Sequence, residues 1–123
     1  MFARSASLHL KPNHVEEFTR LIDNEVIPMM RGLKGFQDKI VLVASGGLEA
    51  ISLSLWDLKE DAEAYGRGTY QEVVKALATV VEGAPWIETR AVSNSTFHKI
   101  PARIAAEGQG VLFGEGRQRQ SPS

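Results

Sequence analysis

Apolar and polar residues alternate over residues 51–56 with the period of a β-strand. Two helix-cap signatures follow, because Asp57 and Thr69 each precede a glutamate by three positions, with two glycines between them. The pattern predicts a strand ending at Trp56, a short helix closed by the glycines, and a longer helix over residues 69–81.

The rest of the first hundred residues completes the fold. Strand-like patterns cover residues 3–11, 36–44 and 86–92. Apolar positions recur every three or four places over residues 15–29, which predicts an amphipathic helix whose last turn Pro28 should kink or tighten. The order β-α-β-β-α-α-β predicts an α+β fold of the ferredoxin-like, split βαβ kind, with helices on one face of a four-stranded antiparallel sheet.

The second face of that sheet also carries apolar residues. The run Ile40–Ala44 is apolar on both faces of its strand, and Trp86 points away from Ile87. An apolar face without helices over it favours a partner. We therefore expect a homodimer whose sheets pack face to face.

Composition limits the function classes. The chain has 123 residues, a net charge of -1 and no cysteine, so we expect one domain without disulfides. Basic residues are scattered, which argues against nucleic-acid binding. The N-terminus lacks the apolar core of a signal peptide, and no apolar run is long enough to span a bilayer. We expect a cytoplasmic protein without a membrane segment.

The C-terminal part differs from the rest in composition. Residues 99–123 are rich in glycine and arginine, but Val111, Leu112 and Phe113 form a small apolar group. We predict a domain over residues 1–98 and a tail over residues 99–123 that crosses onto the partner subunit.

Metal ligation lacks the expected spacing. The three histidines are not paired at i and i+4, and no carboxylate cluster recurs at ligand spacing. Glu60, Asp61 and Glu63 fit the solvated first turn of a helix. We expect no metal and no phosphate-binding loop.

Several segments resemble the antibiotic biosynthesis monooxygenase family: EVIPMMRGLKGF, SLWDLKEDAEAY and TYQEVVKAL, within residues 3–95. The resemblance implies a dimeric α+β barrel fold. It implies several activities, because the family is known to include cofactor-free oxygenases of polyketide anthrones, haem-degrading enzymes, signalling-quinone enzymes and members without known activity.

The haem-degrading branch of this family fits poorly. Its iron-ligating histidine falls at or beside Val74, its strand asparagine falls within residues 3–7, and its second-helix aromatic corresponds to Tyr65. We therefore expect no haem degradation and no cofactor.

Five residues are candidates for a site, and each has a structural alternative. His9 fits a general base, or an interface or solvent histidine; Tyr65 fits a hydrogen-bond donor, or an aromatic capping the core. Trp56, Tyr70 and Phe18 fit the wall of a small apolar or aromatic ligand site, or core packing. Ser52 and Ser54 are small residues that leave space.

Three functions remain open from the sequence. The first is a cofactor-independent monooxygenase acting on a small aromatic or quinol-type substrate. The second is a non-catalytic small-molecule binder or stress-response dimer. The third is an isomerase or decarboxylase of an aromatic acid, with Arg4 or Arg90 binding the carboxylate. A cavity in which polar groups converge would favour the first over the second.

Overall fold

The computed structural model describes residues 1–100, and the predicted tail lies almost wholly outside them. The elements, in chain order, are β1 (Phe2–Leu10), α1 (Val15–Leu21), η1 (Ile22–Val26), α2 (Ile27–Arg31), β2 (Phe36–Val43), β3 (Glu49–Trp56), α3 (Lys59–Arg67), α4 (Tyr70–Ala76) and β4 (Val81–Ala91). Among these residues, no helix is long and apolar enough to cross a membrane.

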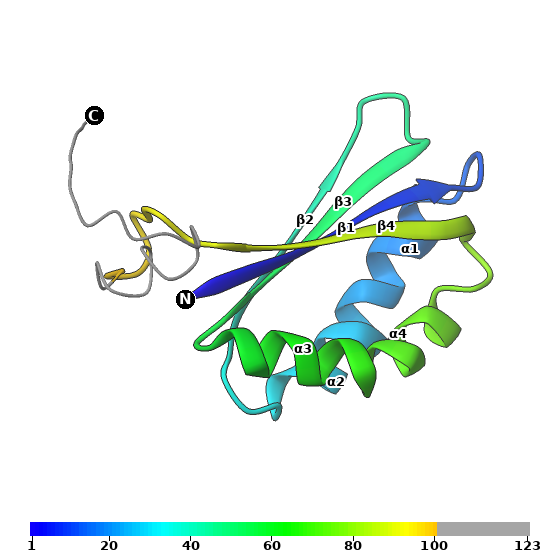
Figure 1. Ribbon diagram of the computed structural model, residues 1–123. Helices are drawn as coiled ribbons and strands as arrows, with labels where there is room; N and C mark the ends of the chain where they lie inside the picture. The colour runs from blue at the N-terminus through cyan, green and yellow to red at the C-terminus, as the bar shows by residue number, and fades with distance from the viewer. Residues whose placement is uncertain (101–123) are drawn as a thin grey trace.

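The four strands form one antiparallel sheet in the order β2-β3-β1-β4. The helices lie together on one side of this sheet (Figure 1). This arrangement confirms the predicted α+β, ferredoxin-like fold.

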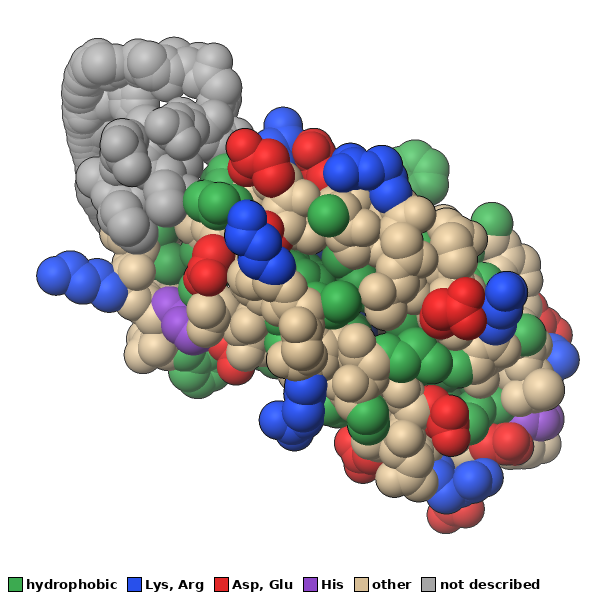
Figure 2. Space-filling view, turned by 90° about the horizontal axis from the view of Figure 1, so that it is seen from below, with side chains coloured by type: hydrophobic (Ala, Val, Ile, Leu, Met, Phe, Trp, Pro, Cys, Tyr) green, Lys and Arg blue, Asp and Glu red, His purple; other side chains and the backbone are tan. Residues whose placement is uncertain are grey.

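The core lies between the helices and the inner face of the sheet. Alternation along β1 turns Ala6, Leu8 and Leu10 toward the helices, and the helical stripe contributes Phe18 and Met30. Seen from the helix side, acidic and basic side chains are interspersed around a central apolar area (Figure 2).

The first helix is continuous but changes its winding. A π-helical segment, η1, separates α1 from α2, and Pro28 stands in the first turn of α2. Because proline has no N–H to donate, it fits best where the preceding turn is already irregular. The expected tightening at Pro28 is wrong, since the turn before it is widened.

The predicted side-chain caps are wrong at both later helices. Neither Asp57 nor Thr69 forms a capping hydrogen bond; Asp57 instead accepts a 2.8 Å hydrogen bond from Gln37. The predicted helix over residues 69–81 is also too long, because α4 ends at Ala76 and β4 already begins at Val81. Val80 and Val81 fit the apolar pattern of a helix and also that of a strand. In the structure the N–H of Lys11 donates a hydrogen bond to the carbonyl of Val80, as in a strand pair.

Gly35, directly before β2, lies in close contact with α3. Its φ of 79° is left-handed, and an added Cβ would lie 2.0 Å from the Asp61 carboxylate. Asp61 is buried, so the expectation of a solvated carboxylate at this position is wrong.

The outer face of the sheet carries large exposed apolar side chains: Ile40, Leu42, Ile51 and Trp86. Trp86 is 69% exposed. At one end of the sheet, beyond β4, His98 contacts the Asp38 carboxylate of β2.

Candidate functional site

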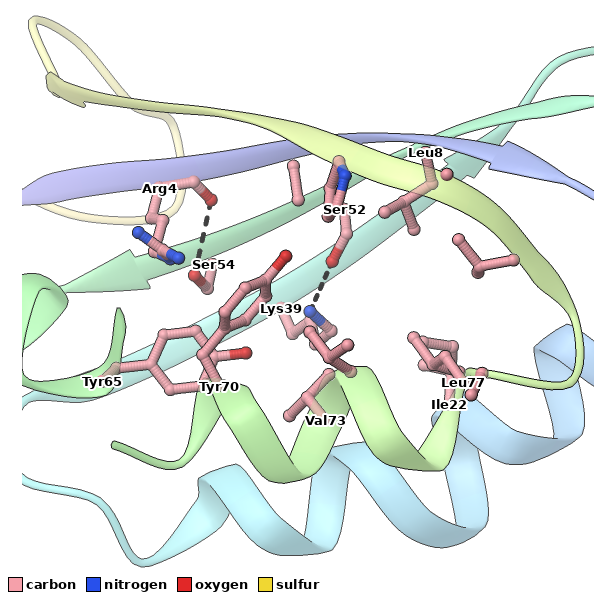
Figure 3. A pocket seen from close by; sticks show the side chains of 16 residues that line it. Arg4, Leu8, Ile22, Lys39, Ser52, Ser54, Tyr65, Tyr70, Val73 and Leu77 are labelled. Carbon is pink, nitrogen blue, oxygen red and sulfur yellow. Dashed lines mark hydrogen bonds between the residues drawn. The ribbon is translucent and has the colours of Figure 1, made fainter. Parts of the chain in front are cut away.

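A cavity of about 230 Å³ lies between the inner face of the sheet and α3 and α4 (Figure 3). Its volume is slightly below the roughly 300–1,000 Å³ common for ligand pockets, which suits a small ligand. Most of the lining is apolar, including Leu8, Val73 and Leu77. The polar lining residues are Arg4, Lys39, Ser52, Ser54, Tyr65 and Tyr70.

Strand register brings two cationic residues of the cavity into one row. Arg4 of β1 and Lys39 of β2 both pair with Ser54 of β3, one from each side. Neighbouring strands are about 4.8 Å apart, so the two Cα atoms are separated by roughly 10 Å. Small serines on the strand between them leave the space that the longer side chains border, which confirms the predicted role of Ser52 and Ser54.

Lys39 is a half-buried lysine in an apolar surrounding. Its Nζ donates a 2.5 Å hydrogen bond to the Ser52 hydroxyl. Burial, together with the smaller effect of the positive charge of Arg4, lowers the pKa of Lys39 to about 8. A lysine with this pKa exchanges protons near neutral pH, as a general base must.

Three aromatic side chains form a stack beside the row. The rings of Trp56 and Tyr65 are stacked at 5.0 Å, and Tyr65 meets Tyr70 edge-on at 5.7 Å. Trp56 is fully buried, and its Nε1–H donates to the Ser54 hydroxyl at 2.8 Å. The stack holds the two phenols in place, with their hydroxyl groups directed into the cavity (Figure 3).

Both phenols stay protonated at neutral pH. Burial raises the pKa of Tyr65 far above its ordinary value, and burial also raises the pKa of Tyr70. The positive charge of Arg4 opposes the rise at each phenol without cancelling it. Tyr65 and Tyr70 are therefore hydrogen-bond donors for an anion in the cavity.

Arg4 lies against the two tyrosines. Its guanidinium carbon is 4.7 Å from the Tyr70 ring centroid and 5.6 Å from that of Tyr65. Gly66 of α3 makes room for it, because an added Cβ there would lie 2.9 Å from Arg4 Nη1.

Comparisons with known proteins bear on the fold. No family model matches the chain, and no curated protein matches its sequence. Solved structures do match, among them a monooxygenase from Streptomyces coelicolor in complex with the ligand Nanaomycin D, with a TM-score of 0.65 at 15% identity over 81% of this chain and 91% of that one.

Two further structures are similar to the same extent. A protein of unknown function from Nitrosomonas europaea has a TM-score of 0.64 at 19% identity, covering 82% of this chain and 94% of that one. A protein from Bordetella bronchiseptica, provisionally described as an antibiotic biosynthesis monooxygenase, has a TM-score of 0.63 at 12% identity, over 72% and 93%. The chain has the antibiotic biosynthesis monooxygenase fold. The predicted resemblance is confirmed at the level of the fold.

The five predicted site residues lie in four different places. Tyr65 and Tyr70 line the cavity. Trp56 lies behind Tyr65 as a supporting layer. Phe18 is fully buried and lines a neighbouring cavity of about 240 Å³ instead.

His9 lies elsewhere. It is exposed on the outer face of the sheet, where Glu49 and Glu82 are its partners in the strand register. The structure therefore does not bring His9 together with Tyr65, and the predicted pairing of the two in one pocket is wrong for this chain on its own. The physical reason is alternation along β1, which turns Leu8 inward and His9 outward.

Lys39 was not among the site residues predicted from the sequence. The signal was its position, since Lys39 shares the inner face of β2 with Val41 and Val43. Arg4 likewise shares the inner face of β1 with Ala6 and Leu8. Arg4 was already a candidate for binding a carboxylate, and a long cation at an inward position of a strand is the pattern that would have found Lys39 as well.

The described residues offer no acidic or metal-binding group at this place. Within residues 1–100, no three His, Asp or Glu side chains lie close enough to hold a metal ion. Val73 and Val74, which occupy the region matched to the haem-ligating histidine, both line the cavity with apolar side chains. The arrangement suits a planar apolar ligand with an acidic hydroxyl group.

Proposed function

We propose that this chain is a cofactor-independent monooxygenase acting on a small aromatic, quinol-type substrate. The observation that carries the proposal is the convergence of Lys39, Ser52, Tyr65 and Tyr70 on one otherwise apolar cavity. Polar groups alone would also suit a binder, but a lysine with a pKa of about 8 beside two phenol donors gives this cavity a group that can exchange a proton, which a non-catalytic binder does not need.

The substrate itself supplies the electrons for dioxygen. Removal of a phenolic proton makes an electron-rich anion that transfers an electron to O₂, and the two radicals then combine at a ring carbon. For an anthrone-type CH₂ group, one oxygen atom becomes the new carbonyl oxygen and the other leaves as water, so that R₂CH₂ and O₂ give R₂C=O and H₂O. The protein must hold the anion and exchange one proton.

The side chains of the cavity suit those two tasks. Lys39 with a pKa of about 8 takes the phenolic proton, in the role that the sequence analysis gave to His9. The protonated Tyr65 and Tyr70 donate hydrogen bonds to the developing oxyanion. The similarity in fold to the Streptomyces monooxygenase in complex with the ligand Nanaomycin D supports a small-molecule ligand.

Oxygen uptake tests the proposal. We expect oxygen uptake with a hydroxyanthrone, with one ¹⁸O atom from ¹⁸O₂ in the new carbonyl group. With 1,4-dihydroxynaphthalene we expect 2-hydroxy-1,4-naphthoquinone and water, with one ¹⁸O atom in the new hydroxyl group; oxidation to 1,4-naphthoquinone without ¹⁸O does not count as the proposed reaction. Lys39→Met should lower kcat by about 10²-fold or more, the usual contribution of a general base. Lys11→Met is the matched control, because that lysine lies outside the cavity. Absence of uptake across a broad quinol panel would contradict the proposed reaction.

We also propose that two copies associate through the outer face of the sheet. Support comes from the exposed Ile40, Leu42, Ile51 and Trp86 on that face. Analytical ultracentrifugation should give a dimer, and Leu42→Glu should weaken association at least tenfold because it places a charge in the apolar contact. Arg20→Glu on the helix side is the control. A monomeric wild-type protein at high micromolar concentration would refute this interface.

A further inference from the structure

We infer that the ligand of this cavity carries a carboxylate in addition to its phenol, and that Arg4 binds the carboxylate. This inference rests on the proposed function for the nature of the ring. It adds the chemical class of the substrate, a hydroxyaryl carboxylic acid.

The charge of the cavity is the first observation. Arg4 and Lys39 both line it, whereas no Asp or Glu of the described residues does. Within residues 1–100, neither cation takes part in an ion pair. Two cationic residues bordering one apolar space, without a carboxylate, leave a positive charge that an anionic ligand would neutralise.

The separation of the two cations is the second observation. They flank Ser54 in one row of the sheet, roughly 10 Å apart at their Cα atoms. This spacing lets the two side chains address two groups on one planar ligand. Lys39 is suited to the titrating phenol, because a single ammonium exchanges a proton readily; Arg4, always charged and forked, is suited to a carboxylate.

The setting of Arg4 is the third observation. Its guanidinium lies over the Tyr70 ring at 4.7 Å, a cation–π contact. Among the side-chain hydrogen bonds of residues 1–100, none uses an N–H donor of Arg4, so these donors are available to a ligand. Gly66, in the last turn of α3, keeps the position next to Nη1 open.

Paired probes that differ by one carboxylate test the inference without any turnover. We expect 1-hydroxy-2-naphthoate to bind the wild-type protein at least tenfold more tightly than 1-naphthol in isothermal titration calorimetry. Arg4→Gln should reduce this preference to within twofold while changing the affinity for 1-naphthol by less than threefold. Arg90→Gln is the matched control, since Arg90 is a cation on the outer face, where it pairs with Glu88 at 2.5 Å.

A second variant displaces Arg4 while keeping its charge. Gly66→Ala crowds the guanidinium and should reduce the carboxylate preference at least threefold, whereas Gly68→Ala at the end of α3, with its nearest contact at 3.4 Å, should retain it. This pair carries the test if circular dichroism shows that Arg4→Gln fails to fold.

Equal affinity of the wild-type protein for the two probes would overturn the inference, and so would a preference that survives both Arg4→Gln and Gly66→Ala. The outcome is distinct from that of the oxygen experiment. Oxygen uptake with neutral 1,4-dihydroxynaphthalene and no carboxylate preference would leave the reaction standing and remove the inference. A carboxylate preference without oxygen uptake would leave the inference standing and contradict the proposed reaction.

Discussion

The two faces of the sheet are made by the same strands but have opposite character. Along β3, Ser52 and Ser54 face the helices, while Ile51 and Leu53 face away from them. The usual arrangement of a sheet covered on one side is the reverse, with apolar residues inward and polar residues outward. The inversion coincides with the cavity on one side and with the exposed apolar surface on the other, so the proposed ligand and the proposed second copy both rest on the same departure from the usual pattern.

The largest difference between the faces should appear at their two tryptophans. Trp56→Ala removes a fully buried ring and should lower the free energy of unfolding by about 3–5 kcal/mol. Urea denaturation monitored by circular dichroism measures this. A loss below about 1 kcal/mol would mean that the aromatic stack is not a support for Tyr65.

Gly35 tests the inner layer at its tightest contact. Gly35→Ala combines a left-handed backbone with a Cβ that would meet the Asp61 carboxylate, so we expect a loss of about 2–4 kcal/mol. Gly46→Ala, where nothing lies within 4 Å, should change stability by less than about 0.5 kcal/mol. Equal effects of the two variants would contradict the packing described for α3.

Lys39, on the inner face, should make the free energy of unfolding depend on pH. Its pKa in the folded protein is about 8, below the usual 10.5, so the unfolded chain binds more protons between these values and stability should rise with pH across this window. We expect a rise on the order of 2 kcal/mol between pH 8 and 10, reduced toward pH 10 because tyrosines in the unfolded chain begin to ionise there and oppose it. Lys39→Met should abolish the rise in urea titrations; a rise that persists would assign it to another group.

The smallest effect on the protomer should come from the outer face. Trp86→Ala removes a ring that is 69% exposed and should change the free energy of unfolding by less than about 0.5 kcal/mol at the lowest measurable protein concentration. A larger loss in the free energy of unfolding that grows with protein concentration would indicate association through the outer face, and would thereby strengthen the contrast between the two faces. A larger loss independent of concentration would show that Trp86 packs within one chain.

The fold was predictable because its signals are local. Alternation in the strands and the three-to-four repeat of the first helix both depend on neighbouring residues. The end of α4 was not predictable in this way, because Val80 and Val81 satisfy both periods and the sheet decides between them. The capping role of Asp57 failed for a similar reason, since Gln37 from another strand competes for its carboxylate.

The site was predictable only in part. Tyr65 and Tyr70 follow from the aromatic-rich link between α3 and α4, whereas Trp56 and Phe18 lie one layer behind or beside the cavity. His9 attracted a catalytic role because of its chemistry, although its alternation with Leu8 and Leu10 already placed it on the other face. Lys39 lies on β2, an edge strand that is not adjacent to β1. Only the register of β1 and β2 against β3 shows that Lys39 shares a row with Arg4.

The inward serines of β3 also have a consequence for protein design. A sequence optimised only for stability on this backbone would exchange the two faces of β3, because valines at positions 52 and 54 would fill the interior and polar residues would solubilise the exterior. Such a protein would be more stable, but it would lack both the cavity and the exposed apolar surface. The two serines of this one strand therefore keep open a space that apolar side chains would fill.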